Sequence, residues 1–176
     1  MSELSEVRNR HVGLIAALAA VALIADLVTK QIALANFSLA EPVSILGGFL
    51  KFTRVSNSGA AFSLGEDATW LFSAAKIVVI IVILWISRRV RVPIWAVIFG
   101  LLVGGASGNL VDRVFRPPSP FQGAVIDWIQ LPNWPVFNIA DMAVVCGGAL
   151  AVWASFRGIN LDGSIETKSA EEEKKG

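Results

Sequence analysis

The stretch "PIWAVIFGLLVGGASGNLVDRV", residues 93–114, decides the fold. It opens with a nearly unbroken apolar run, close to the roughly 20 residues that a helix needs to cross a bilayer. Glycine recurs in it every four residues, at Gly100, Gly104 and Gly108. Such a stripe of small residues lets a second helix approach closely inside a membrane. The stretch therefore predicts a transmembrane helix that packs tightly against another helix.

The composition of the whole chain agrees with a membrane protein. Of its 176 residues, 55% are hydrophobic and only 16% are charged, whereas soluble domains carry about 25% charged residues. The net charge of +1 gives no case for nucleic-acid binding. The single cysteine, Cys146, excludes an intrachain disulfide and a thiolate metal cluster. The single histidine, His11, excludes a zinc protease site of the HExxH type, so we expect neither a metal nor another cofactor.

Three further segments are long and apolar enough to span a bilayer. The predicted spans are about 12–35, 69–87, 93–111 and 136–156. The first begins like a secretory signal peptide, but its apolar run continues past Asp26 and Lys30, and three more spans follow. We therefore expect an all-α polytopic membrane protein, with residues 1–157 as a single membrane-embedded domain.

Basic residues predict the orientation, because Lys and Arg favour the cytoplasmic side. They concentrate before the first span, between the second and third, and after the fourth, at Arg8, Arg10, Arg88, Arg89, Arg91 and Arg157. We expect both termini in the cytoplasm and the loops 36–68 and 112–135 outside. Residues 158–176 are charged and are expected to form a disordered cytoplasmic tail. Lys76 lies inside the second span, where snorkelling towards the outer face is the simplest interpretation.

The first outer loop contains two patterns. In "VSILGGFLKFTRV", residues 43–55, β-branched and aromatic residues flank two glycines, which predicts short strands or a hairpin on the membrane surface. Asn57 and Gly59 follow, and they predict a tight turn with little side-chain bulk, which a ligand backbone can approach. We therefore include both among the candidate substrate-binding residues, although this turn pattern is common on its own.

The acidic residues near the bilayer all fall in its predicted outer half. Asp141 lies roughly 8 Å and Asp26 roughly 14 Å inside the outer ends of their spans. Asp26 and Lys30 are an i, i+4 pair, for which a structural ion pair is favoured over a catalytic role. Asp112 and Arg113 at the end of the third span either cap the helix and snorkel or take part in a site; the spacing leaves both open.

Asp127 and Asp141 differ from the other acids, because residues 117–156 contain no Lys or Arg. Two carboxylates brought together at low dielectric cannot both ionise readily and would share a proton. That arrangement activates water for amide hydrolysis. Alternatively, Asp141 interacts with the amides at the start of its own helix and Asp127 is an ordinary surface residue.

Five motifs resemble those of the signal peptidase II family, the lipoprotein signal peptidases. They are "DLVTK" (26–30), "NSGAAFS" (57–63), "GGASGNLVDRV" (104–114), "VIDWI" (125–129) and "FNIAD" (137–141), in the order found in the family. The resemblance covers about residues 12–156. It implies a bacterial inner-membrane aspartyl endopeptidase. Such an enzyme cleaves the signal peptide from prolipoproteins just before a cysteine that carries diacylglycerol.

The resemblance also implies residue roles. Asp127 and Asp141 match the catalytic pair. The expected substrate-pocket residues are Asn57, Asn109, Arg113 and Asn138, and the expected structural polar residues are Asp26, Lys30 and Asp112. The family fold adds a small extracytoplasmic β-cradle from loop 36–68, an active site near the outer face and a short half-helix near Asp127. We expect a monomer in contact with membrane lipids, because a site built within one chain needs no partner chain.

The main alternative is a small proton-coupled membrane carrier that uses Asp26, Asp112 and Asp141 as a relay. A relay needs acidic groups across the whole membrane, and the cytoplasmic halves of the second, third and fourth spans contain none. A purely structural four-helix protein would leave the clustered Asn, Asp and Arg residues without a use. The peptidase is therefore the preferred prediction.

Overall fold

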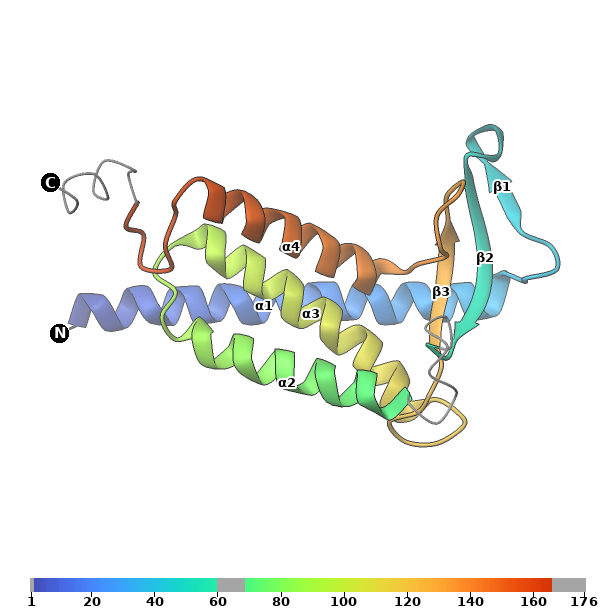
Figure 1. The fold of residues 1–176 in the computed structure, drawn as a ribbon, viewed down its shortest axis with the longest axis horizontal. Helices are drawn as coiled ribbons and strands as arrows, with labels where there is room; N and C mark the ends of the chain where they lie inside the picture. The colour runs from blue at the N-terminus through green and yellow to red at the C-terminus, as the bar shows by residue number, and fades with distance from the viewer. Residues whose placement is uncertain (1, 60–68, 166–176) are drawn as a thin grey trace, which may run out of the picture.

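The computed structural model describes residues 2–59 and 69–165, with side chains from residue 11 onward. In these ranges a helical bundle carries a small sheet at one end (Figure 1). The helices are α1 (Ser2–Asn36), α2 (Thr69–Ser87), α3 (Pro93–Phe115) and α4 (Ile139–Phe156). The strands are β1 (Val43–Ile45), β2 (Leu50–Asn57) and β3 (Val125–Gln130), with a short 3-10 helix, η1 (Leu46–Gly48), after β1.

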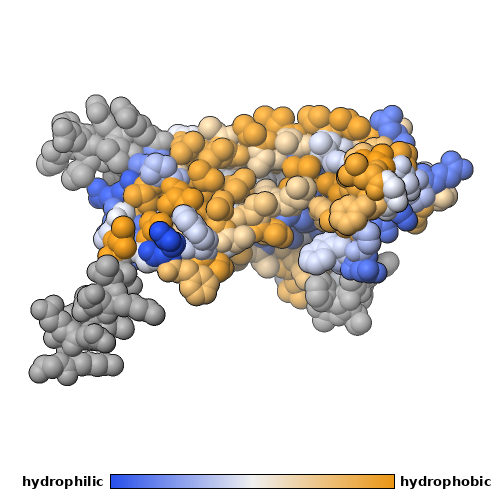
Figure 2. Space-filling view, turned by 90° about the horizontal axis from the view of Figure 1, so that it is seen from above, coloured by the Kyte–Doolittle hydropathy of each residue, from blue (hydrophilic) through white to orange (hydrophobic). Residues whose placement is uncertain are grey.

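The four predicted spans are confirmed. Each α-helix contains a stretch long and apolar enough to cross a membrane, and the first of these stretches is His11–Asn36. Apolar residues cover most of the face of the bundle that Figure 2 shows, between its two ends, and many large apolar residues are exposed, such as Val21, Ile81 and Val145. A lipid environment accounts for this exposure, since soluble proteins rarely show so extensive an apolar surface. The fold is therefore the expected membrane bundle with a small sheet.

The glycine stripe of α3 is the surface on which α1 packs. A Cβ atom built on Gly104 would lie 2.7 Å from the backbone oxygen of Ala19 and 2.7 Å from the Cβ of Ala22. On the neighbouring face, a Cβ on Gly105 would overlap the carbonyl oxygen of Ala140 in α4. The close approach predicted from the sequence is confirmed, and α3 is the central helix that contacts α1, α2 and α4.

The three strands form an antiparallel sheet in the order β1-β2-β3. It lies at the end of the bundle opposite the start of α1 (Figure 1). The strands expected in loop 36–68 are thus present, but the half-helix expected near Asp127 is not: Asp127 lies in β3, opposite Val55 of β2. The reason is that β3 contains the β-branched residues Val125, Ile126 and Ile129, which favour a strand, and all three pair with β2.

The end of the chain also differs from the prediction. Residues 158–165 do not form a disordered tail but turn back onto the bundle. The amide of Arg91 donates to the oxygen of Leu161 at 2.8 Å, and the indole nitrogen of Trp95 donates to the oxygen of Ile159 at 2.9 Å. Ile159 and Leu161 pack against the apolar core, which explains the turn. The rest of the predicted tail, 166–176, lies outside the described residues.

We expect Gly104→Ala to lower the free energy of unfolding by about 1–3 kcal/mol, the usual cost of overpacking. The added methyl group would meet α1 backbone and side-chain atoms at 2.7 Å, so α1 and α3 would have to separate. Gly148→Ala in α4 is the matched control, because a Cβ there has nothing within 4 Å. Thermal unfolding in detergent measures both variants, and equal midpoints would contradict the role of the stripe.

Candidate active site between the sheet and the helix ends

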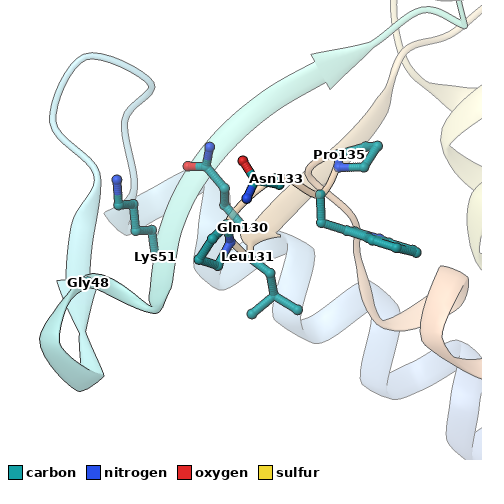
Figure 3. A pocket seen from close by; sticks show the side chains of 8 residues that line it. Gly48, Lys51, Gln130, Leu131, Asn133 and Pro135 are labelled. Carbon is teal, nitrogen blue, oxygen red and sulfur yellow. The ribbon is translucent and has the colours of Figure 1, made fainter.

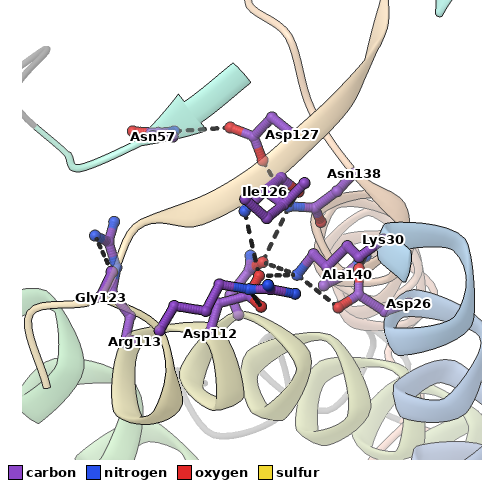
Figure 4. A network of polar contacts seen from close by, with 12 residues as sticks. Asp26, Lys30, Asn57, Asp112, Arg113, Gly123, Ile126, Asp127, Asn138 and Ala140 are labelled. Atoms are coloured by element: carbon purple, nitrogen blue, oxygen red, sulfur yellow. Dashed lines mark hydrogen bonds and ion pairs between the residues drawn. The ribbon is translucent and has the colours of Figure 1, made fainter. Parts of the chain in front are cut away.

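Asp127 is a buried carboxylate with both oxygens hydrogen-bonded. Its side chain is 2% exposed and lies on β3 between β2 and the start of α4 (Figure 4). Asn57, at the end of β2, donates its Nδ2 to Asp127 Oδ2 at 2.9 Å. Asn138 donates its Nδ2 to Asp127 Oδ1 at 2.7 Å. Asp127 is therefore not the ordinary surface residue of the alternative interpretation.

Asp141 lies in the first turn of α4 and is partly exposed. Its backbone amide donates to Asn138 Oδ1 at 2.9 Å, and its Oδ2 accepts the backbone amide of Asn138 at 3.2 Å. This reciprocal pair is a capping box, and it begins α4 at Ile139 rather than at 136. The other oxygen, Oδ1, accepts a hydrogen bond from Asn109 Nδ2 at 2.7 Å. Asp141 thus caps its helix and also faces a second polar group.

Asn138 joins the two carboxylates. It is fully buried, and it contacts Asp127 through its side chain and Asp141 through both its side chain and its backbone. Its Nδ2 also donates to Asn109 Oδ1 at 3.0 Å. The structure therefore brings Asp127, Asn138, Asn109 and Asp141 into one hydrogen-bonded network, although they come from β3, α3 and the entry to α4.

The environment of Asp127 favours its protonated form. Burial, and to a smaller extent the negative charge of Asp141, raises the pKa of Asp127 from 3.8 to about 6. The hydrogen bonds from Asn57 and Asn138 act in the opposite direction, because they stabilise the carboxylate. Burial prevails, and the site consists of two neighbouring acids of which one retains a proton more readily than a free aspartic acid.

Lys30 lies beneath this network and holds its parts together. Its ammonium group is 2.6 Å from Asp26 Oδ2, 2.8 Å from Asp112 Oδ2 and 3.0 Å from Asn109 Oδ1 (Figure 4). Asp26 and Lys30 are fully buried, and Asp112 is 1% exposed. Asp112 also pairs with Arg116, so two cations balance two carboxylates. The expected ion pair between Asp26 and Lys30 is present.

The two aspartates of this ion cluster also fix the backbone of the site. Asp26 Oδ1 accepts the amide of Ala140 at 2.9 Å, at the start of α4. Asp112 Oδ2 accepts the amide of Ile126 at 3.2 Å, next to Asp127. The ions on α1 and α3 thereby position the segments that carry both candidate catalytic residues.

Arg113 and Gly59 shape the turn after β2. Arg113 Nη1 donates to the backbone oxygens of Ser58 and Gly123, each at 3.0 Å, and its side chain is almost fully buried. The amide of Gly59 donates to Asn57 Oδ1 at 2.9 Å, and its φ of 87° explains the glycine there. The predicted turn is present up to Gly59, and the remainder of its motif, residues 60–63, lies outside the described residues.

A cavity of about 380 Å³ opens beside Asp141 and Asn109, between α2, α3 and α4. Its other lining residues are apolar except for Lys76. The sequence alone did not assign Lys76 to a site, although a cation inside an apolar span could have indicated one.

A second hollow of about 670 Å³ lies on the sheet, lined by residues such as Lys51, Gln130 and Asn133 (Figure 3). Among the described residues, no group of three or more His, Cys, Asp or Glu side chains is placed to hold a metal.

Comparison with known proteins identifies the family. The family model described as signal peptidase (SPase) II matches residues 18–157. A lipoprotein signal peptidase of Streptomyces coelicolor is 44% identical over 157 residues, which cover 89% of this chain and 77% of that protein. One from Mycobacterium tuberculosis (strain ATCC 25618 / H37Rv) is 42% identical over 153 residues, covering 87% and 76%.

Solved structures agree with the sequence matches. A bacterial membrane enzyme solved by the in meso method at 1.9 Å resolution superposes with a TM-score of 0.75 at 27% identity, covering 83% of this chain and 94% of that one. Another, at 2.3 Å resolution, gives a TM-score of 0.74 at 26% identity, covering 89% and 96%. Its motifs, its four membrane-spanning helices and these relatives together show that the chain belongs to the signal peptidase II family of bacterial multi-pass membrane peptidases.

Proposed function

We propose that this peptidase is an aspartic-type endopeptidase that removes the signal peptide from diacylglyceryl-modified prolipoproteins, cleaving just before the lipidated cysteine. Asp127 and Asp141 are the proposed catalytic pair. The observation that carries the proposal is the single network in which Asn138 holds both carboxylates. The names of the relatives, lipoprotein signal peptidases, supply the substrate class.

The environments of the two acids assign their roles. Asp127, whose pKa is raised to about 6, retains the proton and donates it to the oxygen of the scissile carbonyl. Asp141, which borders the cavity, takes a proton from the attacking water, whose oxygen bonds to the carbonyl carbon. Collapse of the tetrahedral intermediate breaks the C–N bond, and the leaving amine takes a proton from the pair. Two acids with different environments suit this division of labour.

The other site residues act around this pair. Asn109 borders the cavity and is placed to contact the substrate backbone. Asn57 and Asn138 orient Asp127 through hydrogen bonds. Arg113 and Gly59 shape the turn that carries Asn57, so their contribution to binding is through the form of that turn. No metal or nucleotide takes part in this scheme.

The proposed orientation has both termini in the cytoplasm and the catalytic pair near the outer face of the inner membrane. The start of α1 and the end of α4 lie at one end of the bundle, and the sheet lies at the other (Figure 1). Arg88, Arg89 and Arg91 follow α2 at the first of these ends, as expected for a cytoplasmic loop. Lipid chains of the substrate remain in the bilayer, and the enzyme acts as a monomer.

A proton-coupled carrier is not favoured. Its relay would need Asp26 and Asp112 free to exchange protons, but both carboxylates lie within 2.8 Å of the Lys30 ammonium group in a buried cluster. The relatives are peptidases by name. Within the four described spans, no acidic residue besides Asp26, Asp112 and Asp141 extends such a relay towards the other membrane face.

The purified protein in detergent should cleave a diacylglyceryl-modified prolipoprotein and leave the same precursor without lipid intact. The lipid places the scissile bond at the level of the catalytic pair, so cleavage depends on it. A gel-shift assay separates precursor from product. Equal cleavage of both precursors would contradict the lipid requirement, and no cleavage of either by folded protein would contradict the proposed function.

Asp127→Asn and Asp141→Asn should each abolish cleavage, with a fall in kcat of at least about 1,000-fold, because neither variant can share and transfer the proton. Asp162→Asn is the matched control, since Asp162 is an exposed carboxylate beyond α4. The same gel assay applies, with thermal unfolding to verify folding. Retained cleavage by both site variants would rule out the catalytic pair.

The pH dependence of kcat/KM should show loss of activity as pH rises through about 6. The active form holds a proton on Asp127, whose pKa is raised to about 6, and this proton is lost above that pH. Asn57→Ala removes a hydrogen bond that stabilises the carboxylate, so it should raise the pKa and move the basic limb to higher pH. A limb that stays in place in this variant would show that another group controls it.

A further inference from the structure

Lys76 is a cation inside the membrane-spanning part of α2 that faces the candidate active site. It lies roughly 10 Å along the helix from Thr69, the residue at the sheet end. Together with Asn109 and Asp141 it lines the cavity of about 380 Å³. The rest of the lining is apolar, with Phe72, Leu102 and Val144 among its members. Lys76 is therefore the cationic residue in the lining of this cavity, where it can contact a bound molecule.

Lys76 differs from Lys30 in making no hydrogen bond or ion pair within the described ranges 2–59 and 69–165, although the charge of Asp141 acts on it across the cavity. Lys30 pairs with two carboxylates and an asparagine, whereas no hydrogen bond or ion pair of these ranges includes the Lys76 ammonium group. An ammonium group within a membrane span is costly and usually marks a functional contact. Simple snorkelling does not explain why the side chain lines a cavity shared with Asp141.

The shape of the bundle indicates what enters this cavity. α2 packs on α3, while α4 packs on α3 and α1, so a groove remains along α3 between α2 and α4 where the cavity lies. The mostly apolar lining of this cavity suits the apolar side chains of a signal helix. The last four carbonyl oxygens of any helix lack partners within it, and in a bilayer no water replaces them. A lysine near a helix C-terminus hydrogen-bonds these oxygens and interacts favourably with the helix dipole.

We propose that Lys76 is a substrate-positioning residue whose ammonium group donates hydrogen bonds to the free main-chain carbonyl oxygens at the C-terminal end of the substrate's signal helix. This proposal rests on the proposed function. The scissile bond follows the signal helix, so the helix end that lies next to Asp141 is its C-terminal end. The positive charge of Lys76 suits that end and would disfavour the opposite direction of the helix. Lys76 thereby sets the depth and the direction in which the peptide is presented.

Steady-state cleavage of a lipidated prolipoprotein by Lys76→Met, Lys76→Arg and wild type tests this role. The Met variant should raise KM about tenfold, the order expected for one lost charge-assisted hydrogen bond, with kcat unchanged, and the Arg variant should restore KM. Arg88→Met, which removes a cation just after α2, is the matched control and should behave as wild type. Absence of cleavage by the wild-type protein would contradict the proposed function. Cleavage by wild type together with an unaltered KM in Lys76→Met would instead overturn the proposed role of Lys76.

Inhibition by the released signal peptide distinguishes the source of the carbonyl oxygens, because the ester carbonyls of the diacylglyceryl group offer the same chemistry. If the helix end is the ligand, Lys76→Met raises the inhibition constant of the signal peptide by the same factor as KM. A raised KM with an unchanged inhibition constant assigns Lys76 to the ester groups and overturns the proposal. A lower kcat with unchanged KM also overturns it, because Lys76 would then act on Asp141 rather than on the substrate.

Discussion

The buried ammonium group of Lys30 is the interaction on which the rest of the site depends. It is fully buried and lies within 3.0 Å of Asp26, Asp112 and Asn109. Removing one partner of such a cluster leaves an uncompensated buried charge, which costs about 3–5 kcal/mol. The cluster can form only where α1 and α3 are very close, and the glycine stripe of α3 provides that closeness. The close packing of α1 on α3 and the ion cluster around Lys30 therefore depend on each other.

The two candidate catalytic acids have different surroundings. Asp26 and Asp112 pair with Lys30 and Arg116, whereas burial raises the pKa of Asp127 even though the amides of Asn57 and Asn138 stabilise its carboxylate. Asp141 reaches the cavity and caps a helix whose first amides stabilise negative charge. A single buried asparagine, Asn138, keeps both at fixed positions. The two identical side chains thus have different environments because one lies on a strand and the other in the first turn of a helix.

The sequence predicted the spans and the glycine contact because hydropathy and the four-residue spacing are local properties of a helix. It also indicated the pairing of Asp26 with Lys30, which lie one turn apart. It did not predict that Asp127 lies on a strand, since β3 pairs with β2 about 70 residues away. It also did not predict that Lys76 lines the cavity or that residues 158–165 fold back onto the bundle. Both features depend on contacts with distant helices, which no local sequence pattern encodes.

The distribution of contacts among the helices also separates stability from substrate access. α1, α3 and α4 pack together through small residues and buried ions, whereas α2 packs mainly on α3. Under the proposed function, the substrate's signal helix enters beside the active site, and a helix outside the tightly packed core can border its path. α2, which packs mainly on α3, is such a helix. Within the part of the chain that the structure describes, α2 carries a cation, Lys76, that forms no ion pair, whereas the buried Lys30 between α1 and α3 is paired with two carboxylates.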